Sequence, residues 1–193
     1  PPNGPLAIES SYDEAMCAPG VLELVKKANE EKYDAVILAC FSDPALEQAR
    51  EISDILVTGI EELSLHVAAM LGSKFTVLTM TDKRVPSKEA HVRRFKLEGS
   101  LASVRPLGMS VAEIEADEKR ACAQILKVAK EAAEKDGAEV IVLGCAGFAG
   151  MSEKMSAELG VPVLDGVVSA LIIATGLVKA GYTTSKIRRY KAN

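Results

Sequence analysis

The 193-residue sequence has little aromatic character, since it holds no Trp, four Phe and four Tyr. Its core must therefore be built from Ala, Val, Ile and Leu, which is typical of buried parallel strands covered by helices. With 48% apolar and 26% charged residues, the composition is that of a globular protein and excludes disordered and fibrous classes. The length fits one compact unit or two lobes of roughly 100 residues each.

Positive charge is also scarce, because 23 Lys and Arg face 27 Asp and Glu, a net charge of −4. This balance argues against nucleic acid as a partner, since phosphates need a basic field. No apolar run reaches the roughly 18–20 residues of a membrane span, and the nearest candidate, residues 166–177, is soon followed by Lys179. The first five residues lack the basic and apolar regions of a signal peptide, so we expect a cytoplasmic protein with no membrane partner.

Short apolar runs alternate with helical patterns along the chain. The predicted strands cover residues 34–40, 55–57, 75–80, 101–107, 138–145 and 161–164. The predicted helices cover residues 44–52, 61–71, 87–97, 111–135, 152–159 and 166–180. Asp43 before Pro44 has the pattern of an N-cap followed by Pro at the first helical position. The alternation predicts an α/β architecture with parallel sheets, in which ligands bind beyond the carboxyl ends of the strands.

Two segments repeat one pattern. Residues 33–40 (YDAVILAC) and 138–145 (AEVIVLGC) each place an acidic residue before an apolar run, then a small residue and a Cys at the strand's end. A loop and a helix follow each Cys, and a helix N-terminus lowers the pKa of a thiol. Taken singly, either Cys is as well explained as a small buried hydrophobe. The repetition indicates a two-fold duplication and favours a chemical role for Cys40 and Cys145.

The remaining candidates carry less signal. Cys17 and Cys122 lie outside such a context, and we interpret them as structural; all four cysteines are expected to be reduced. His66 and His91 lie in helical segments without a partner at metal-ligand spacing, so no metal site is expected. The sequence also contains no phosphate-binding loop and no nucleophile elbow, and we expect no cofactor.

Six segments together resemble one protein family: residues 4–15, 39–44, 75–79, 142–147, 161–166 and 184–186. They are similar to the aspartate/glutamate/hydantoin racemase superfamily and, within it, to the hydantoin and allantoin racemase branch. The resemblance runs over nearly the whole chain, and the pair of cysteines is the defining feature of the family. Many relatives carry two successive Thr after the third strand, where this chain has Thr79 followed by Met80.

The resemblance implies two pseudo-symmetric lobes, each a parallel sheet flanked by helices, with the active site between the lobes. It assigns residues 1–72 and 165–193 to the first lobe and residues 73–164 to the second. Relatives usually begin with a strand and an Asn-Pro-Asn-Thr loop, whereas this chain begins after that point. We therefore expect the first lobe to lack about one strand and one helix, which leaves a sheet edge unpaired.

The resemblance further implies cofactor-independent racemisation of a 5-substituted hydantoin, with Cys40 and Cys145 as the two catalytic bases. One thiolate removes a proton while the other thiol donates one to the opposite face. The backbone N–H groups of Phe41, Ser42, Ala146 and Gly147 are the expected donors to the developing enolate oxygen. Glu9 and Thr79 are further substrate-binding candidates, with a surface carboxylate and simple β-propensity as their alternatives.

Other functions stay open at this point. The absence of Arg and Lys beside the two cysteines favours a neutral cyclic imide over a free amino acid. An aspartate/glutamate-type amino-acid racemase and a non-catalytic α/β protein that binds a small ligand are the alternatives. In each case the expected partner is a small molecule. We also expect a homo-oligomer, with the apolar residues 166–177 as a possible interface.

Overall fold

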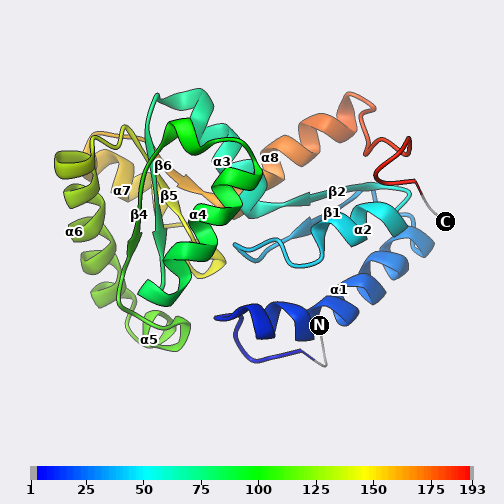
Figure 1. Cartoon of the computed structure of the whole chain (residues 1–193), viewed down its shortest axis with the longest axis horizontal. Helices are drawn as coiled ribbons and strands as arrows, with labels where there is room; N and C mark the ends of the chain where they lie inside the picture. The colour runs from blue at the N-terminus through cyan, green and yellow to red at the C-terminus, as the bar shows by residue number, and fades with distance from the viewer. Residues whose placement is uncertain (1–3, 192–193) are drawn as a thin grey trace. The chain divides into compact units, whose positions relative to one another are not determined.

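The computed structural model describes residues 4–191, apart from the side chain of Glu115. The chain divides into two compact units (Figure 1). Unit 1 combines the residues up to Ile60 with those from Ala170 onward, and unit 2 comprises Glu61–Ser169. The resemblance places the boundaries between the lobes at residues 72/73 and 164/165, whereas the boundaries between the units lie at 60/61 and 169/170.

Unit 1 holds a small parallel sheet with helices packed on it. Its elements are α1 (Ser11–Glu30), β1 (Ala35–Leu38), α2 (Leu46–Ile52) and β2 (Leu56–Gly59). The strands β1 and β2 run parallel, with Leu38 opposite Gly59. A small core of Val25, Leu38, Leu46, Ala49 and Val57 lies where α1 and α2 meet the sheet.

The helix α1 is absent from the sequence-based predictions, and its start has a local cause. Ser10 is in an extended conformation and its hydroxyl accepts a hydrogen bond from the N–H of Asp13 at 3.2 Å. The Asp13 carboxylate in turn accepts one from the N–H of Glu9 at 3.1 Å. These reciprocal bonds satisfy amides that the first helical turn leaves unpaired.

Unit 2 contains a four-stranded parallel sheet in the order β4-β3-β5-β6. Its strands are β3 (Phe75–Thr79), β4 (Leu101–Pro106), β5 (Val140–Leu143) and β6 (Val163–Asp165). Its helices are α3 (Ile60–Leu71), α4 (Val85–Arg94), α5 (Val111–Ala116), α6 (Glu118–Asp136) and α7 (Ser152–Leu159), with single turns η1 (Asp82–Arg84), η2 (Glu98–Ser100) and η3 (Ala146–Phe148). The last helix, α8 (Gly166–Lys179), begins in unit 2 and ends in unit 1.

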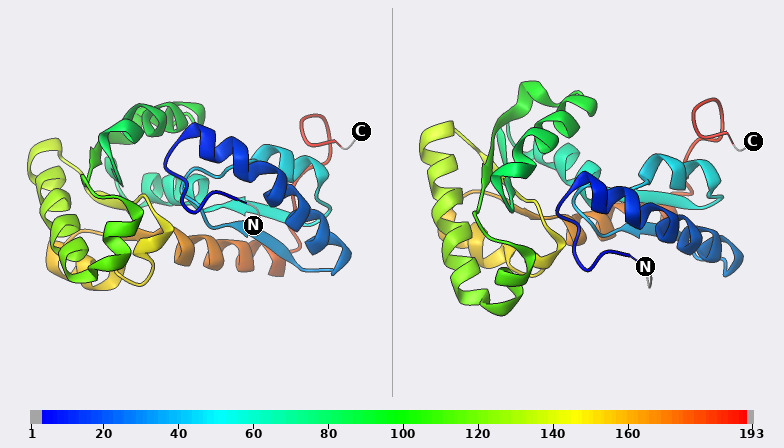
Figure 2. Two further views of the ribbon diagram at one scale, coloured as in Figure 1. Left: turned by 90° about the horizontal axis from the view of Figure 1, so that it is seen from below. Right: turned by 60° about the horizontal axis from the view of Figure 1, so that its bottom comes forward.

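Helices cover both faces of this sheet: α6 and α7 lie on one face, and α3 and α4 lie on the other (Figures 1 and 2). The apolar residues under α6 and α7 form an extensive core, which includes Ile125, Ile141, Leu143, Phe148 and Met155. The predicted α/β class, with parallel sheets flanked by helices, is therefore confirmed.

Two local predictions are wrong. The helix predicted over residues 111–135 is interrupted at Asp117, whose backbone leaves helical geometry and whose carboxylate caps α6 by accepting from the N–H of Arg120 at 3.0 Å. Asp43 does not cap α2, because Asp43 and Ala45 both have positive φ angles, 47° and 60°, and the helix begins only at Leu46. No helix within residues 4–191 is long and apolar enough to cross a membrane.

Candidate active site

Cys40 lies just beyond the carboxyl end of a strand in unit 1. It follows the last residue of β1, Leu38, by two positions and is half-buried. Its carbonyl oxygen accepts hydrogen bonds from the N–H groups of Ser42 at 2.8 Å and Asp43 at 2.9 Å, which makes the following turn tight. The Cys40 sulfur lies 3.4 Å from the Ser42 hydroxyl. The thiol is thus fixed at the edge of the sheet beside a hydroxyl that can donate to a thiolate.

Cys145 occupies the matching position in unit 2. It follows the last residue of β5, Leu143, by two positions and is also half-buried. Its sulfur accepts a hydrogen bond from the N–H of Gly147 at 3.4 Å. A side chain on Gly144 would lie 2.2 Å from the carbonyl oxygen of Leu78, so only glycine lets β5 approach β3 directly before the thiol. A backbone donor at this distance stabilises the thiolate form of a cysteine.

The other predicted site residues divide between the units. Phe41 is only 5% exposed, so its ring is buried rather than facing solvent. The N–H of Ser42 donates to the Cys40 carbonyl, and its hydroxyl lies 3.4 Å from the Cys40 sulfur. Glu9 lies in the turn that begins α1, where its N–H donates to Asp13.

In unit 2, Thr79 and Cys145 lie at the same edge of the sheet. Thr79 follows Leu78, which pairs with Leu143 of β5, and it is 1% exposed. Ala146 and Gly147 form the first turn after Cys145, with Phe148 buried beneath them. The structure therefore groups Cys40 with Ser42 and Cys145 with Thr79, Ala146 and Gly147.

Two aspartates near these loops were missed as site residues by the sequence analysis. The Asp43 carboxylate lies over Gly59 at the end of β2. The Asp165 carboxylate accepts from the N–H of Gly150, in the loop after Cys145, at 2.8 Å. Both side chains are buried. Both aspartates lie within segments that carry the family resemblance, which is the one sign of them in the sequence. Their contacts with Gly59 and Gly150 join residues 15 or more positions apart, so a local pattern does not reveal them.

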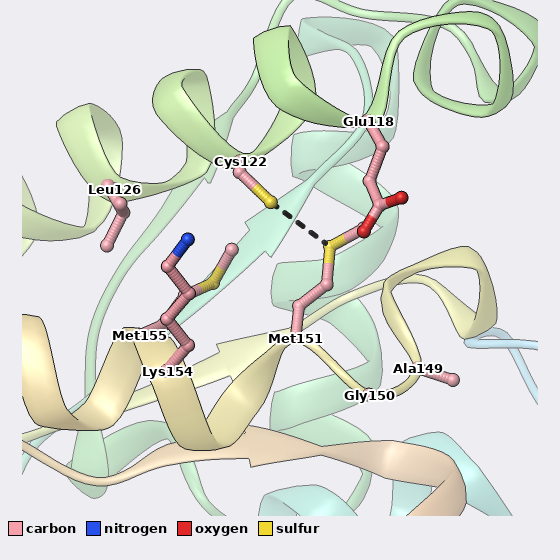
Figure 3. A pocket seen from close by; sticks show the side chains of 8 residues that line it. All are labelled: Glu118, Cys122, Leu126, Ala149, Gly150, Met151, Lys154 and Met155. Atoms are coloured by element: carbon pink, nitrogen blue, oxygen red, sulfur yellow. Dashed lines mark hydrogen bonds between the residues drawn. The ribbon is translucent and has the colours of Figure 1, made fainter.

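Cys17 and Cys122 lie away from the strand ends. Cys17 is buried in α1, where burial raises the pKa of its thiol and Glu14 adds to the effect. Cys122 lies on α6 in a pocket of unit 2, and its sulfur points toward the Met151 sulfur at 4.0 Å (Figure 3). The loop after Cys145 forms one wall of this pocket through Ala149 and Gly150. A buried thiol and a thiol beside a thioether are the environments of structural cysteines.

The two histidines also have partners in the structure. The His66 ring packs edge-on against Phe95, with centroids 5.9 Å apart. The Nδ1 of His91 lies 2.7 Å from a carboxylate oxygen of Glu61, which also binds the Lys88 ammonium at 2.9 Å. Within the described residues, no three His, Cys, Asp or Glu side chains are grouped so as to hold a metal ion.

Comparisons with known proteins agree over both units. A family model described as Asp/Glu/Hydantoin racemase matches residues 1–174. The hydantoin racemase of Pseudomonas sp. (strain NS671) is 40% identical over 191 residues, which cover 99% of this chain and 77% of that protein. The structure of allantoin racemase from Pseudomonas fluorescens is 37% identical with a TM-score of 0.93, covering 98% of this chain and 80% of that one. Allantoin racemase from Klebsiella pneumoniae is 30% identical with a TM-score of 0.95, covering 98% and 78%.

Proposed function

Because the chain belongs to the Asp/Glu/hydantoin racemase family, we propose that it racemises 5-substituted hydantoins, a class that includes the cyclic ureide allantoin. The observation that carries the proposal is the pair of equivalent thiols, Cys40 and Cys145. Each lies two residues beyond a parallel strand, with a hydroxyl or an N–H group beside its sulfur. The hydantoin and allantoin racemases to which the chain is similar support this substrate class.

The proposed step moves one proton at C5 of the ring, the carbon between a carbonyl and a ring nitrogen. One thiolate removes the proton from one face and becomes a thiol, and the opposing thiol donates its proton to the other face and becomes a thiolate. The mechanism requires each sulfur to come within about 3–3.5 Å of C5. Since the two groups share one proton, they titrate as a coupled pair. No cofactor takes part in this scheme.

Removing the proton leaves an enolate, whose oxygen needs hydrogen-bond donors. We assign this role to N–H groups of the loops that follow the two cysteines, those of Phe41, Ser42, Ala146 and Gly147. In the structure the N–H of Ser42 bonds to the Cys40 carbonyl and that of Gly147 to the Cys145 sulfur. Thr79 and Glu9 remain candidates for contacts with the ring.

The two loops also favour a neutral ring over an amino acid. Residues 40–45 and 145–151 contain no Lys or Arg, and each loop buries a Phe, Phe41 or Phe148. A free amino acid carries a carboxylate and an ammonium, which bind best to charged partners. A hydantoin carries only amide donors and acceptors, and backbone groups can match them. An aspartate/glutamate-type racemase is therefore the second choice, and a non-catalytic ligand-binding protein the third.

The proposal is tested by following the C5 proton of a single enantiomer of a 5-alkyl hydantoin in deuterated water, without added cofactor. We expect loss of optical rotation together with incorporation of deuterium, both above the protein-free rate. L-Glutamate and L-aspartate, assayed in parallel, should keep their α-protons. Exchange of an amino acid but not of any hydantoin would contradict the proposal in favour of the amino-acid racemase, and binding without exchange would favour a ligand-binding protein.

The remaining expectations from the sequence belong to this proposal. We propose that the protein acts in the cytoplasm on a small molecule and forms a homo-oligomer. The helix α8 supports the second point, because it exposes large apolar side chains: Leu171 is 58% and Ile172 66% exposed, with Val168 on the same side of the helix. Sedimentation of the full chain over a range of concentrations measures this association.

A further inference from the structure

A buried aspartate joins the loop after each thiol to the end of the neighbouring strand. In unit 2 the aspartate belongs to the strand, and in unit 1 it belongs to the loop. In unit 2 the aspartate is Asp165, the last residue of β6. One of its carboxylate oxygens accepts from the N–H of Gly150 at 2.8 Å. The other accepts from the N–H groups of Val167 at 2.8 Å and Val168 at 3.1 Å, at the start of α8. One side chain thus ties together a strand end, a helix start and the loop after Cys145.

In unit 1 the same position of the sheet is occupied by glycine. Gly59 pairs with Leu38, the last residue of β1, as Asp165 pairs with Leu143, the last residue of β5. The carboxylate comes instead from the loop, since Asp43 follows Cys40 by three residues. A Cβ atom on Gly59 would lie 2.1 Å from the carboxyl carbon of Asp43. The Asp43 side chain therefore fills the space that a side chain on Gly59 would need.

The loop after Cys40 needs such support for its backbone. Asp43 has a φ of 47° and Gly150 a φ of 85°, both in the left-handed region. A non-glycine residue in that region persists only when its surroundings hold it there. The two units exchange the positions of the Asp and the Gly. In unit 1 the Asp is in the loop and lies over a Gly at the strand end, whereas in unit 2 the Asp is at the strand end and bonds to a Gly in the loop.

We propose that Asp43 and Asp165 are positioning residues with the same task, each holding the loop after one thiol against the end of the neighbouring parallel strand. Neither contacts the substrate in this scheme; each acts through the cysteine of its own unit. The inference rests on the proposed function for the catalytic meaning of the thiols. The reactivity of each thiol toward an alkylating reagent, however, can be measured without turnover.

The first test is Asp165→Asn in the full chain. The amide keeps one carbonyl oxygen for the N–H groups of α8 but turns an NH₂ group toward the N–H of Gly150, so it separates loop anchoring from helix capping. We expect the pH midpoint for iodoacetamide alkylation of Cys145, followed by mass spectrometry of its peptide, to rise by about one unit. This corresponds to an about tenfold slower reaction at neutral pH, because a loosened loop no longer holds the N–H of Gly147 on the sulfur. Cys40 in the same sample should keep its profile.

The matched control is Ser156→Ala, which removes a hydrogen bond from the N–H of Val163 to the Ser156 hydroxyl, 2.9 Å long, on the same strand β6. A purely structural effect would move the Cys145 profile in both variants. The proposal expects a shift in Asp165→Asn alone. An unchanged Cys145 profile in Asp165→Asn, or an equal shift in Ser156→Ala, would overturn it.

The second test exchanges the two partners in unit 1. Asp43→Gly removes the carboxylate, and Gly59→Asp adds one that collides with Asp43. We expect each single variant to change the Cys40 alkylation profile, and the double variant, which copies the arrangement of unit 2, to return at least half of the way to the parent. Such non-additivity reports direct contact between the two positions. A double variant no closer to the parent than the single variants would contradict the proposal.

Ser53→Ala serves as the control for unit 1, because the buried Ser53 hydroxyl bonds Asn29 at 3.1 Å and supports α1 rather than the Cys40 loop. It should leave the Cys40 profile unchanged, and an equal shift in Ser53→Ala would overturn the proposal. Failure of the proposed function would appear differently, as a parent protein that exchanges no hydantoin proton. Site-resolved alkylation would still decide whether Asp43 and Asp165 position the thiols.

Discussion

The two units place a thiol at the same point of a strand–loop–helix sequence but support it with different amounts of core. In unit 2, β5 is paired on both sides, by β3 and β6, and its four residues are at most 1% exposed. In unit 1, as far as residues 4–191 show, β1 is paired only with β2, and of its residues only Leu38 is buried. Cys145 thus follows a buried strand that is paired on both sides. Cys40 follows a partly exposed strand, whose position depends more on polar contacts of the surrounding side chains.

Unit 1 makes up for its small core with polar contacts around α2, the helix after the Cys40 loop. The ammonium of Lys186 donates to the carbonyl oxygens of Arg50 at 2.6 Å and Glu51 at 3.1 Å, in the last turn of α2. Arg189 pairs with Glu47 in the first turn, and Arg50 lies 5.8 Å from the Tyr190 ring centroid. We call Lys186, Arg189 and Tyr190 the C-terminal clasp. Unit 2 instead has a buried polar cluster, in which the Glu61 carboxylate contacts Lys88 and His91.

The largest expected effect separates the two thiols by stereochemistry. Cys40→Ser and Cys145→Ser should each lower net racemisation about a thousandfold, since a serine hydroxyl is a far weaker acid and inversion needs an acid opposite the base. Each variant should still exchange the C5 proton of one enantiomer with deuterium, and the two variants should prefer opposite enantiomers. Proton NMR of each pure enantiomer measures this. Cys17→Ser and Cys122→Ser are the controls and should change activity little.

Two results would contradict the prediction that the two thiols are equivalent bases. If both variants exchanged the same enantiomer, the thiols would not act on opposite faces. If either catalytic variant racemised near the parent rate, one thiol would be dispensable and unit 1 and unit 2 would not contribute equivalent bases.

The next largest effect is expected inside unit 2. Lys88→Met should destabilise this unit by about 3–5 kcal/mol, because it removes the ammonium that pairs with the buried Glu61 carboxylate at 2.9 Å. Burial alone would raise the pKa of Glu61, but Lys88 and His91 more than offset it and hold that pKa below its usual value. Glu61 therefore stabilises the folded parent above its unfolded pKa, and this contribution is lost as the pH falls through its folded pKa. The gap between parent and variant should shrink in acid, below about pH 4.

Urea unfolding at several pH values, with hydrogen exchange to assign the transition to unit 2, measures that gap. Lys130→Met is the matched control, since Lys130 and Glu134 form an ion pair in which both side chains are mostly exposed. It should change stability by at most about 1 kcal/mol. A gap that grew in acid would show that Glu61 is not ionised in the folded parent.

The smallest effect tests the C-terminal clasp. Lys186→Met removes two hydrogen bonds and a positive charge from the end of α2 and should cost about 1–2 kcal/mol. The loss should appear as faster hydrogen exchange in α2 and leave β5 unchanged. Lys191→Met, at an exposed position two residues beyond Arg189, is the control. Equal loss of protection in β5 would show that unit 1 does not depend on its own polar contacts.

The strands of both units could be predicted from the sequence because each is a short apolar run, and parallel pairing follows from the alternation with helices. The positions of Cys40 and Cys145 at the ends of strands could be predicted from the pattern that residues 33–40 and 138–145 share. The helix α1 was missed because Pro19 and Gly20 interrupt its pattern, although both lie within the helix. The break at Asp117 was missed because apolar residues continue on both sides of it. Neither feature is visible in periodicity alone.

The aspartates show a second limit of the sequence. Asp43-Pro44 has the pattern of a helix start, but the Asp43 backbone is left-handed and its carboxylate lies over Gly59, 16 positions further along the chain. Likewise, nothing local links Asp165 to Gly150. These contacts arise from the sheet register, which brings the end of one strand beside the loop that follows its neighbour. Loop positioning is therefore a tertiary property, whereas the strand before each loop is a local one.

The route of the chain through the two units has a consequence for its synthesis. Unit 2 is one continuous stretch, while unit 1 is assembled from two pieces, and Lys186 meets Arg50 across 136 positions. During translation we expect unit 2 to fold as soon as its own residues have emerged, because they form one uninterrupted stretch of the chain. Unit 1 must wait for the residues after Ala170. The segment that carries Cys40 is therefore translated before unit 2 but completes its fold after it, and in that interval it lacks the contacts that the residues after Ala170 supply.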